Sequence, residues 1–155
     1  MPSGPLNYTT AIPAARTTGE CLALLAEAGA GAVAVTYADK VPSGLAFNLD
    51  THVGPRSFTM PVNIDGVFAQ LQKAHQDKRL KGSRGRTAES FVTRKHATDV
   101  AWRVIKDWLE AQLAIIAANM ASLDQVMLPY LQVGPDTTLY QAFSRGNELT
   151  AGSAS

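Results

Sequence analysis

The sequence predicts an α+β domain, in which an antiparallel sheet of three to four strands packs against helices and one long helix occupies the C-terminal half. Three observations support this class. Between residues 33 and 61, short segments of alternating apolar and polar residues follow one another with tight turns between them, which is typical of an antiparallel meander. Apolar residues recur at helical spacing on both sides of this region. No Gly or Pro interrupts residues 87–121, which predicts the long helix.

The first predicted elements are an edge strand and a helix. Residues 7–13 are rich in Thr and Tyr and end at a proline, which indicates an edge strand. Thr17 and Glu20 have the spacing of a capping box, so we expect the helix to begin there. Gly29 is a natural helix end. The apolar face of this helix comprises Cys21, Leu24, Leu25 and Ala28.

Three strands are expected next, at residues 33–37, 45–53 and 56–61. The alternation places Leu45, Phe47, Leu49, Thr51 and Val53 on one side of the second strand, and it predicts that Phe58 and Met60 of the third strand face inward. Short turns join them, so consecutive strands should pair antiparallel.

Helices fill the rest of the chain. Asn63 is expected to cap a second helix, whose apolar stripe is Ile64, Val67, Leu71 and Ala74. Residues 79–87 follow as an exposed basic loop with glycines. Thr87 is expected to cap the long helix, which would reach about 50 Å. Residues 109–120, "LEAQLAIIAANM", are apolar nearly all round, which predicts burial or a subunit interface. Further caps are expected at Ser122, with Gln125, and at Asp136 before a last short helix.

Length and composition define the domain organisation. The chain has 155 residues, of which 46% are hydrophobic and 17% charged, as expected for one domain with a buried core. We expect this domain at residues 7–145, between a flexible N-terminus at 1–6 and a disordered tail at 146–155. No apolar run of about 18 residues and no secretory signal occur, so we expect no membrane association and a cytoplasmic location. The single cysteine fits a reducing compartment.

A search for catalytic and metal-binding patterns gives no convincing site. Cys21 lies on an apolar helix face, so we interpret it as a small buried hydrophobe and not as a nucleophile. His96 and Asp99 are spaced i, i+3 and are expected to form a solvated ion pair. With one Cys and three scattered His, zinc spacing is absent. We therefore expect no enzyme, no metal site and no cofactor.

The distribution of charge is the strongest functional signal. Residues 73–106 contain ten of the fourteen basic residues and three of the thirteen acids, which gives this basic stretch a net charge of +7 and leaves −6 elsewhere. A local patch sets the local electrostatic field whatever the total charge. Helical i, i+4 pairs are also expected inside the stretch, Arg103 with Asp107 and Lys106 with Glu110.

Nucleic acid is the partner that best fits this pattern, because cations on a glycine-containing loop can follow a phosphate backbone. Aromatic side chains near the loop could stack with unpaired bases, so we expect a preference for single strands. The alternatives are a loop kept basic for solubility and a surface that binds an acidic protein. The predicted binding residues are Lys73, Lys78, Arg79, Lys81, Arg84, Arg86, Arg94 and Lys95, with Phe91 and Trp102 for stacking.

A resemblance adds context. The segments "NYTT-IP", "MPVNIDGV" and "AWRVIKDWLEAQLAIIAANM…LPYL…TLYQAF" lie between residues 7 and 143. The chain resembles a group of uncharacterised small proteins encoded by tailed phages and prophages. The resemblance implies a phage accessory protein acting inside the infected bacterium, and it carries over no activity and no functional residue.

Two functional hypotheses follow. In the first, the protein binds nucleic acid, preferably single-stranded DNA, during replication or recombination, and it forms a homo-oligomer through residues 109–121. In the second, it inhibits a host defence or nucleic-acid-processing complex by direct protein contact.

Overall fold

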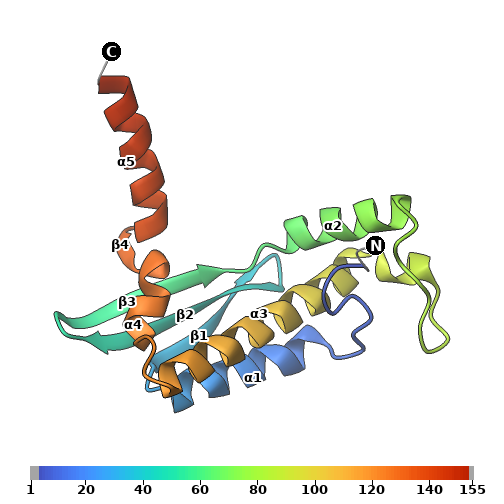
Figure 1. The fold of residues 1–155 in the computed structure, drawn as a ribbon, viewed down its shortest axis with the longest axis horizontal. Helices are drawn as coiled ribbons and strands as arrows, with labels where there is room; N and C mark the ends of the chain where they lie inside the picture. Colours follow the sequence, from blue (N-terminus) through green and yellow to red (C-terminus); the bar gives the residue numbers. More distant parts are fainter. Residues whose placement is uncertain (1–3, 154–155) are drawn as a thin grey trace.

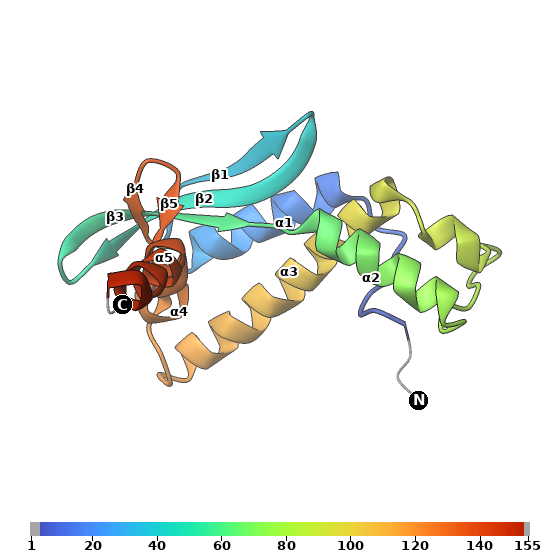
Figure 2. The ribbon, with the colours of Figure 1, turned by 90° about the horizontal axis from the view of Figure 1, so that it is seen from above.

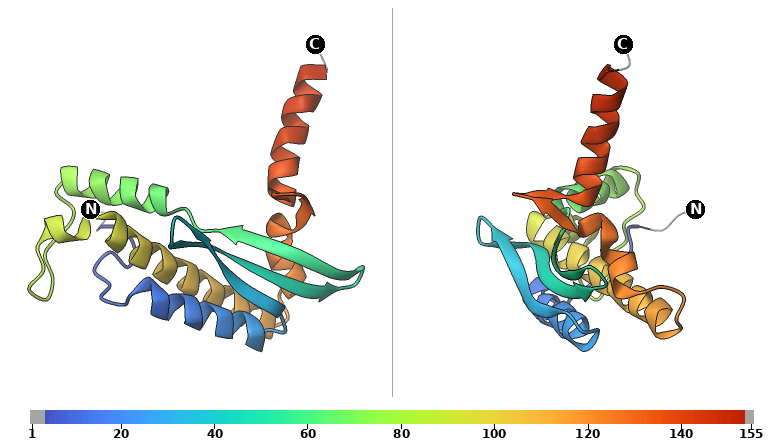
Figure 3. Two further views of the ribbon diagram at one scale, coloured as in Figure 1. Left: turned by 180° about the vertical axis from the view of Figure 1, so that it is seen from behind. Right: turned by 90° about the vertical axis from the view of Figure 1, so that its left-hand side faces the viewer.

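The computed structural model describes the backbone of residues 4–153 and the side chains of residues 4–146. It is an α+β fold, as the sequence predicted: a three-stranded antiparallel sheet lies on two long helices, α1 and α3, and a second, two-stranded sheet follows near the C-terminus (Figure 1). Figure 3 shows both helices along the same face of the three-stranded sheet. The core lies in this contact and consists mainly of apolar side chains from β2, β3, α1 and α3.

The predicted N-terminal strand is wrong. Residues 4–9 form turns, in which Tyr8 donates to the carbonyl of Pro5 and Asn7 has a left-handed φ of 63°. Helix α1 (Ala14–Glu27) begins directly after Pro13, which is its N-cap. Thr17 is therefore no cap. It lies within the helix, fully buried, and its hydroxyl has no hydrogen-bond partner among the described residues.

The predicted end and apolar face of this first helix are confirmed. Gly29 follows α1 with φ 101°, a conformation that favours glycine. Cys21 and Leu25 are fully buried in the core. Burial raises the pKa of the Cys21 thiol to about 11, which fits a structural cysteine.

The three central strands are confirmed, with longer bounds than predicted: β1 (Gly31–Ala38), β2 (Val41–Thr51) and β3 (Gly54–Pro61). They are ordered β1-β2-β3, and Phe47 pairs with Phe58 across the β2–β3 ladder. The two rings stack with centroids 5.6 Å apart. Of the side chains predicted on the inward side, Leu45, Phe47, Leu49, Phe58 and Met60 are buried, because the alternation of period two puts them on one face of the sheet. Val53 is 59% exposed, because β2 ends at Thr51 and Val53 lies in the turn before β3.

Helix α2 (Ile64–Gln76) begins as predicted, since the Asn63 side chain accepts from the Gly66 N–H at 2.9 Å. The long helix begins later than predicted. Residues Ala88–Phe91 form a separate 3-10 helix, η1, and α3 (Arg94–Ala117) starts after Thr93, whose extended backbone separates the two helices. Thr93, not Thr87, is the cap and accepts from the His96 N–H at 3.1 Å. With 24 residues, α3 is about 36 Å long.

The end of α3 is more exposed than its composition predicted. Leu109 is fully buried, but none of the side chains at 110–121 is, and Met120, which follows α3, is 69% exposed. Burial of the segment within the chain is therefore confirmed for Leu109 alone, and an interface with a second copy stays a prediction. Ser122 and Gln125 form the predicted capping box of α4 (Leu123–Met127), which the 3-10 helix η2 (Leu128–Tyr130) follows.

The C-terminal elements are β4 (Gln132–Gly134), β5 (Thr137–Thr138) and α5 (Leu139–Ser153). Asp136 does not cap α5, because it lies in the β4–β5 turn with φ 53°. The Thr138 hydroxyl instead accepts from the Gln141 N–H at 3.3 Å. Helix α5 projects from the body of the molecule and includes residues 146–153, where we expected a disordered tail (Figure 1). Residues 1–3 and 154–155 of the two predicted flexible termini lie outside the described residues.

Candidate nucleic-acid interface

The predicted basic loop is an ordered hairpin, which we call the basic hairpin (residues 77–86). Ser83 and Arg86 exchange both backbone hydrogen bonds, each of 2.9 Å. Between them, Arg84 and Gly85 have φ values of 52° and 76°, which is the type I′ geometry of a two-residue turn. A Cβ atom at Gly82 would lie 2.6 Å from the Arg86 carbonyl oxygen, so only glycine fits there. The hairpin therefore presents Arg84 at its tip.

Arg86 fixes the basic hairpin to the rest of the domain. Its guanidinium donates to the Thr10 carbonyl at 3.0 Å and to His96 Nδ1 at 3.1 Å, and it lies 4.5 Å from the centroid of the Phe91 ring. Such a cation–π contact is worth about 0.5–1 kcal/mol or more when shielded from water. All three contacts point into the protein. These contacts give Arg86 a structural role, and its predicted contact with a phosphate stays a prediction.

His96 accepts one of the Arg86 hydrogen bonds, and the prediction that it is solvated is wrong. It is 4% exposed, whereas we expected a solvated pair with Asp99. Its Nε2 faces the Tyr8 carbonyl, so Nε2–H donates there and Nδ1 accepts from Arg86. Burial lowers the pKa of the imidazole, the hydrogen bond to Tyr8 partly offsets this, and the Arg86 charge lowers it further. His96 is therefore a neutral bridge between the hairpin and the N-terminal segment.

Six of the ten cations in the basic stretch have carboxylate partners. Lys73 and Arg79 share Asp77, at 3.3 and 3.8 Å. On α3, the pairs are Arg94–Asp65, Lys95–Asp99, Arg103–Glu20, Lys106–Glu20 and Lys106–Glu110. The predicted Lys106–Glu110 pair is thus confirmed.

Arg103 pairs with Glu20 of α1 in place of the predicted partner, Asp107, which accepts from the Asn7 amide at 2.7 Å. Burial raises the pKa of the Glu20 carboxyl, but the hydrogen bonds from Arg103 and Arg16 and the charge of Lys106 outweigh it, so the pKa lies below its usual value. The second half of the basic stretch therefore holds α3 against α1.

Three cations remain available for a ligand. Lys78, Lys81 and Arg84 are exposed, and none has an ion-pair partner among the described side chains. All three belong to the basic hairpin, which extends beyond the C-terminal end of α2 (Figure 2). Of the eight cations predicted to bind, these three are therefore both exposed and without an acidic partner among the described side chains, and they lie together on the basic hairpin.

The two predicted stacking residues are not accessible. Phe91 and Trp102 are both fully buried. The Phe91 ring packs edge-on against Tyr8, with centroids 5.6 Å apart, and Trp102 Nε1 donates to the Pro42 carbonyl at 3.1 Å. Neither ring can stack with a base, so this part of the prediction is wrong. Trp102 instead holds the turn end of the β1–β2 hairpin against α3.

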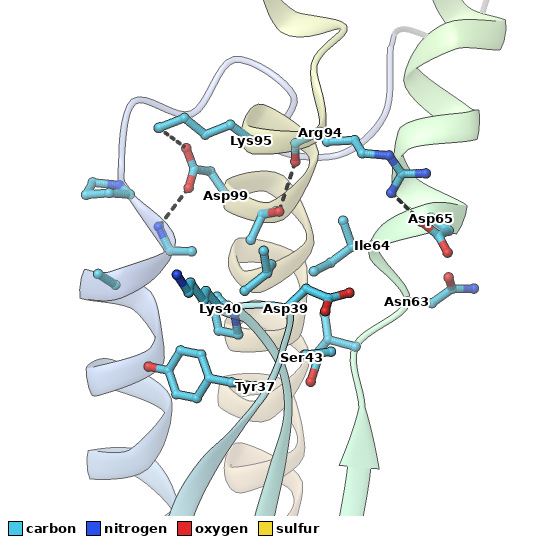
Figure 4. Close-up of a pocket in the computed structure, with 18 residues that line it drawn as sticks. Tyr37, Asp39, Lys40, Ser43, Asn63, Ile64, Asp65, Arg94, Lys95 and Asp99 are labelled. Carbon is cyan, nitrogen blue, oxygen red and sulfur yellow. Dashed lines mark hydrogen bonds and ion pairs between the residues drawn. The ribbon is translucent and has the colours of Figure 1, made fainter.

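A cleft that the sequence did not predict lies at the N-terminal end of α2 and encloses about 910 Å³ (Figure 4). The tip of the β1–β2 hairpin and the first turns of α1, α2 and α3 line it. Figure 4 shows Tyr37 extending from β1 toward α1, with Lys40 beside it. Tyr37 is 64% exposed, and Lys40 has no ion-pair partner among the described side chains. The cleft brings together three helix starts and one hairpin tip that are far apart in sequence. No local sequence pattern reveals such a tertiary arrangement.

The charges around the cleft are mostly compensated. Arg94 pairs with Asp65 at one side. At the other side, Lys95 pairs with Asp99 at 3.4 Å, and Asp99 also accepts from the Ala14 N–H at 2.8 Å. Lys95 and Asp99 line a second, smaller cavity of about 340 Å³, which Arg86 and His96 also line. The small cavity therefore shares Lys95 and Asp99 with the cleft, and Arg86 and His96 with the contacts that hold the basic hairpin.

No group of three His, Cys, Asp or Glu side chains in the described part of the chain could hold a metal ion. Within the same part, no helix is both long and apolar enough to cross a bilayer. Comparisons of the chain with protein-family models, curated proteins and solved structures gave no match. The resemblance to tailed-phage proteins therefore stays a prediction, and the candidate interface depends on its geometry alone.

Proposed function

We propose that this protein binds nucleic acid through the basic hairpin, with Lys78, Lys81 and Arg84 in contact with phosphates. The observation that carries the proposal is that these three cations are exposed on one protrusion without acidic partners among the described side chains. Each phosphate neutralised by such a cation releases condensed counterions, which drives binding and makes it sensitive to salt.

The residues around the three cations strengthen the positive electrostatic potential of the basic hairpin. From Lys73 to Arg84 the chain has five cations and one acid, Asp77, so this segment has a net charge of +4. Arg86 and the type I′ turn hold the hairpin in one conformation, so less conformational entropy is lost on binding than for a flexible loop. Phosphate contacts alone do not read a base sequence, so binding is expected to be unspecific.

The biological setting belongs to the proposal as well. On the sequence resemblance, we propose a phage accessory protein in the cytoplasm of the infected bacterium, with a role in replication or recombination. Self-association through residues 109–121 would place several basic hairpins along one nucleic acid. Met120, which follows α3 and is 69% exposed, supports this part.

A second candidate function is favoured by a different observation. Tyr140 and Phe143 on α5 are 62% and 61% exposed, and α5 lies at the opposite end of the molecule from the basic hairpin (Figure 1). Exposed apolar side chains on a projecting helix are typical of protein contacts. The alternative is therefore an inhibitor that binds a host defence or nucleic-acid-processing complex through α5.

The test compares two triple variants of the full chain that change the net charge equally. Lys78→Ala/Lys81→Ala/Arg84→Ala removes the proposed contacts. Arg16→Ala/Arg56→Ala/Arg145→Ala removes three exposed cations from α1, β3 and α5. Fluorescence anisotropy measures the affinity of each for labelled single- and double-stranded oligonucleotides at low salt.

We expect the hairpin variant to lose most of its affinity and the control to keep it. Equal losses in both variants would show that only total charge matters and would reject the hairpin as the site. Absence of binding by the unmodified protein at low salt would reject the proposed function and leave the α5 inhibitor as the better hypothesis.

A further inference from the structure

Among the exposed aromatic side chains, Tyr37 differs in its position. Tyr37, Tyr140 and Phe143 are the Tyr and Phe residues that the structure leaves more than 60% exposed among the described side chains. Tyr140 and Phe143 lie on the projecting helix α5, whereas Tyr37 lines the cleft of about 910 Å³. The Tyr37 ring makes no aromatic contact among the described residues. An exposed ring in a concave site is suited to stack with a planar ligand.

The cleft walls combine apolar surface with a few polar groups, as small-ligand sites do. Its volume falls within the range of about 300–1,000 Å³ that is usual for such sites. Apolar surface comes from short side chains, including Ala14, Val41 and Pro42. Lys40 stands at the hairpin tip beside Tyr37 and has no ion-pair partner among the described side chains (Figure 4). Lys40 and its neighbour in the turn, Asp39, both line the cleft. The ring and the apolar wall suit the base of one nucleotide, and Lys40 suits its phosphate.

The backbone at the hairpin tip is set to present Lys40. Ala38 pairs with Val41, and between them Asp39 and Lys40 have φ values of 50° and 67°. A type I′ turn normally has Asn and Gly at these positions, because both residues take the left-handed conformation. A lysine there costs about 1 kcal/mol or more, and such backbone strain is concentrated at functional sites. Trp102 donates to the carbonyl of Pro42, which follows the turn by two residues, and so holds this end of the hairpin in place.

The cleft and the basic hairpin lie at opposite ends of α2. Its 13 residues separate them by about 20 Å. At the stacked spacing of about 3.4 Å per nucleotide, a single strand of about six nucleotides covers this distance. The small cavity next to Lys95 and Arg86 lies between the two sites. In a duplex, the bases are paired and stacked inside the helix, so they cannot enter the cleft without being flipped out.

We infer, on the basis of the proposed function, that the cleft binds an unpaired base of a single strand whose phosphates the basic hairpin holds, with Tyr37 stacking on the base and Lys40 on the adjacent phosphate. This assigns the preference for single strands to a residue other than the buried Phe91 and Trp102. Phosphate contacts supply the affinity for any nucleic acid, and the cleft adds affinity for unpaired strands.

The experiment uses full-length protein and two fluorescent probes, a 12-nucleotide oligothymidylate and a duplex of the same length. Tyr37→Ala removes the ring, Tyr37→Phe keeps it, and Tyr140→Ala is the control for loss of an equally exposed tyrosine. We expect Tyr37→Ala to weaken single-strand binding about tenfold and leave duplex binding unchanged, since stacking on one aromatic ring is typically worth such a factor. Tyr37→Phe and Tyr140→Ala are expected to bind like the unmodified protein.

A second readout locates the base directly. Photo-crosslinking with an oligonucleotide that carries 5-bromodeoxyuridine, followed by peptide mapping, is expected to label the peptide that contains Tyr37. Unchanged single-strand binding by Tyr37→Ala would overturn the inference, while loss of binding by the hairpin variant in the same assay would leave the proposed function standing. If the unmodified protein binds neither probe at low salt, the proposed function fails and the inference fails with it.

Discussion

The basic stretch divides at Arg86 into two regions that use the same residue types differently. Before Arg86, the five cations of residues 73–84 have a single acid among them, Asp77. From Arg86 onward, every cation has a fixed partner: Thr10, His96, Asp65, Asp99, Glu20 or Glu110. In the first region, Lys78, Lys81 and Arg84 have no acidic partner among the described side chains. In the second region, Arg86, Arg103 and Lys106 hold the framework together, and Arg94 and Lys95 are exposed but paired. A count of charges along the chain therefore overestimates the charge that a ligand meets.

The largest predicted difference between the two regions is in stability. Arg86→Ala removes two hydrogen bonds and a cation–π contact and leaves His96 Nδ1 without a donor, so we expect the free energy of unfolding to fall by about 2–3 kcal/mol. Arg84→Ala, two positions away, should change it by less than about 0.5 kcal/mol, because Arg84 is exposed and has no ion-pair partner among the described side chains. Urea denaturation measures both. Equal effects of the two substitutions would contradict the division at Arg86.

A smaller effect of pH on stability is expected from His96. Its folded-state pKa lies below the ordinary value of 6.5, so between these two pH values the unfolded chain binds more protons than the folded protein. The contribution of His96 is therefore fully present above pH 6.5 and is lost progressively as the pH falls below it. His96→Gln should flatten this part of the stability curve. A slope that survives in His96→Gln would show that another group causes it.

Features with local signals were predictable from the sequence. Strands β1–β3 alternate with period two, Asn63 precedes an amphipathic run, and Ser122 with Gln125 has the capping-box spacing. Lys106 and Glu110 are spaced i, i+4, about one helical turn apart, so their pairing was predictable as well. The predicted start of the long helix was wrong, because Thr87 and Thr93 are equally good caps in sequence. The packing of Phe91 against Tyr8 and Ala74 separates η1 from α3.

The site was less predictable because its partners are distant in sequence. Glu20 lies 83 positions from Arg103, and Tyr8 lies 88 positions from His96. The sequence identified the cations of the basic hairpin, but burial of Trp102 depends on how α3 meets the sheet. The cleft at Tyr37 is formed by four elements, so no single segment could indicate it.

The two type I′ turns, at Asp39–Lys40 and Arg84–Gly85, provide a third prediction. The second turn already has glycine at its last position, while the first has lysine. Lys40→Gly should therefore raise the free energy of unfolding by up to about 1 kcal/mol, since glycine takes a left-handed φ without strain. The same variant should bind single strands more weakly, because it lacks a cation in the cleft. A stability loss would contradict strain at Lys40.

The smallest predicted effect comes from exposing a paired cation. Asp65→Asn removes the partner of Arg94 at an exposed position, which adds one unit of positive charge. If pairing keeps the second region inactive, affinity for nucleic acid should rise about two- to threefold at low salt, which corresponds to about 0.5 kcal/mol, typical of one exposed charge pair. Anisotropy titration against the unmodified protein measures this change. A decrease would indicate that the Arg94–Asp65 pair itself is needed for binding.

The central claim is that Lys78, Lys81 and Arg84 hold phosphates, and the salt dependence of single-strand binding tests it most directly. Each lost phosphate contact reduces the slope of log K against log salt by about 0.7, so the hairpin triple variant should have a slope lower by about 2 than the unmodified protein. The charge-matched variant at Arg16, Arg56 and Arg145 should keep the full slope. A hairpin variant with an unchanged slope, or a control with the same reduction, would contradict the claim.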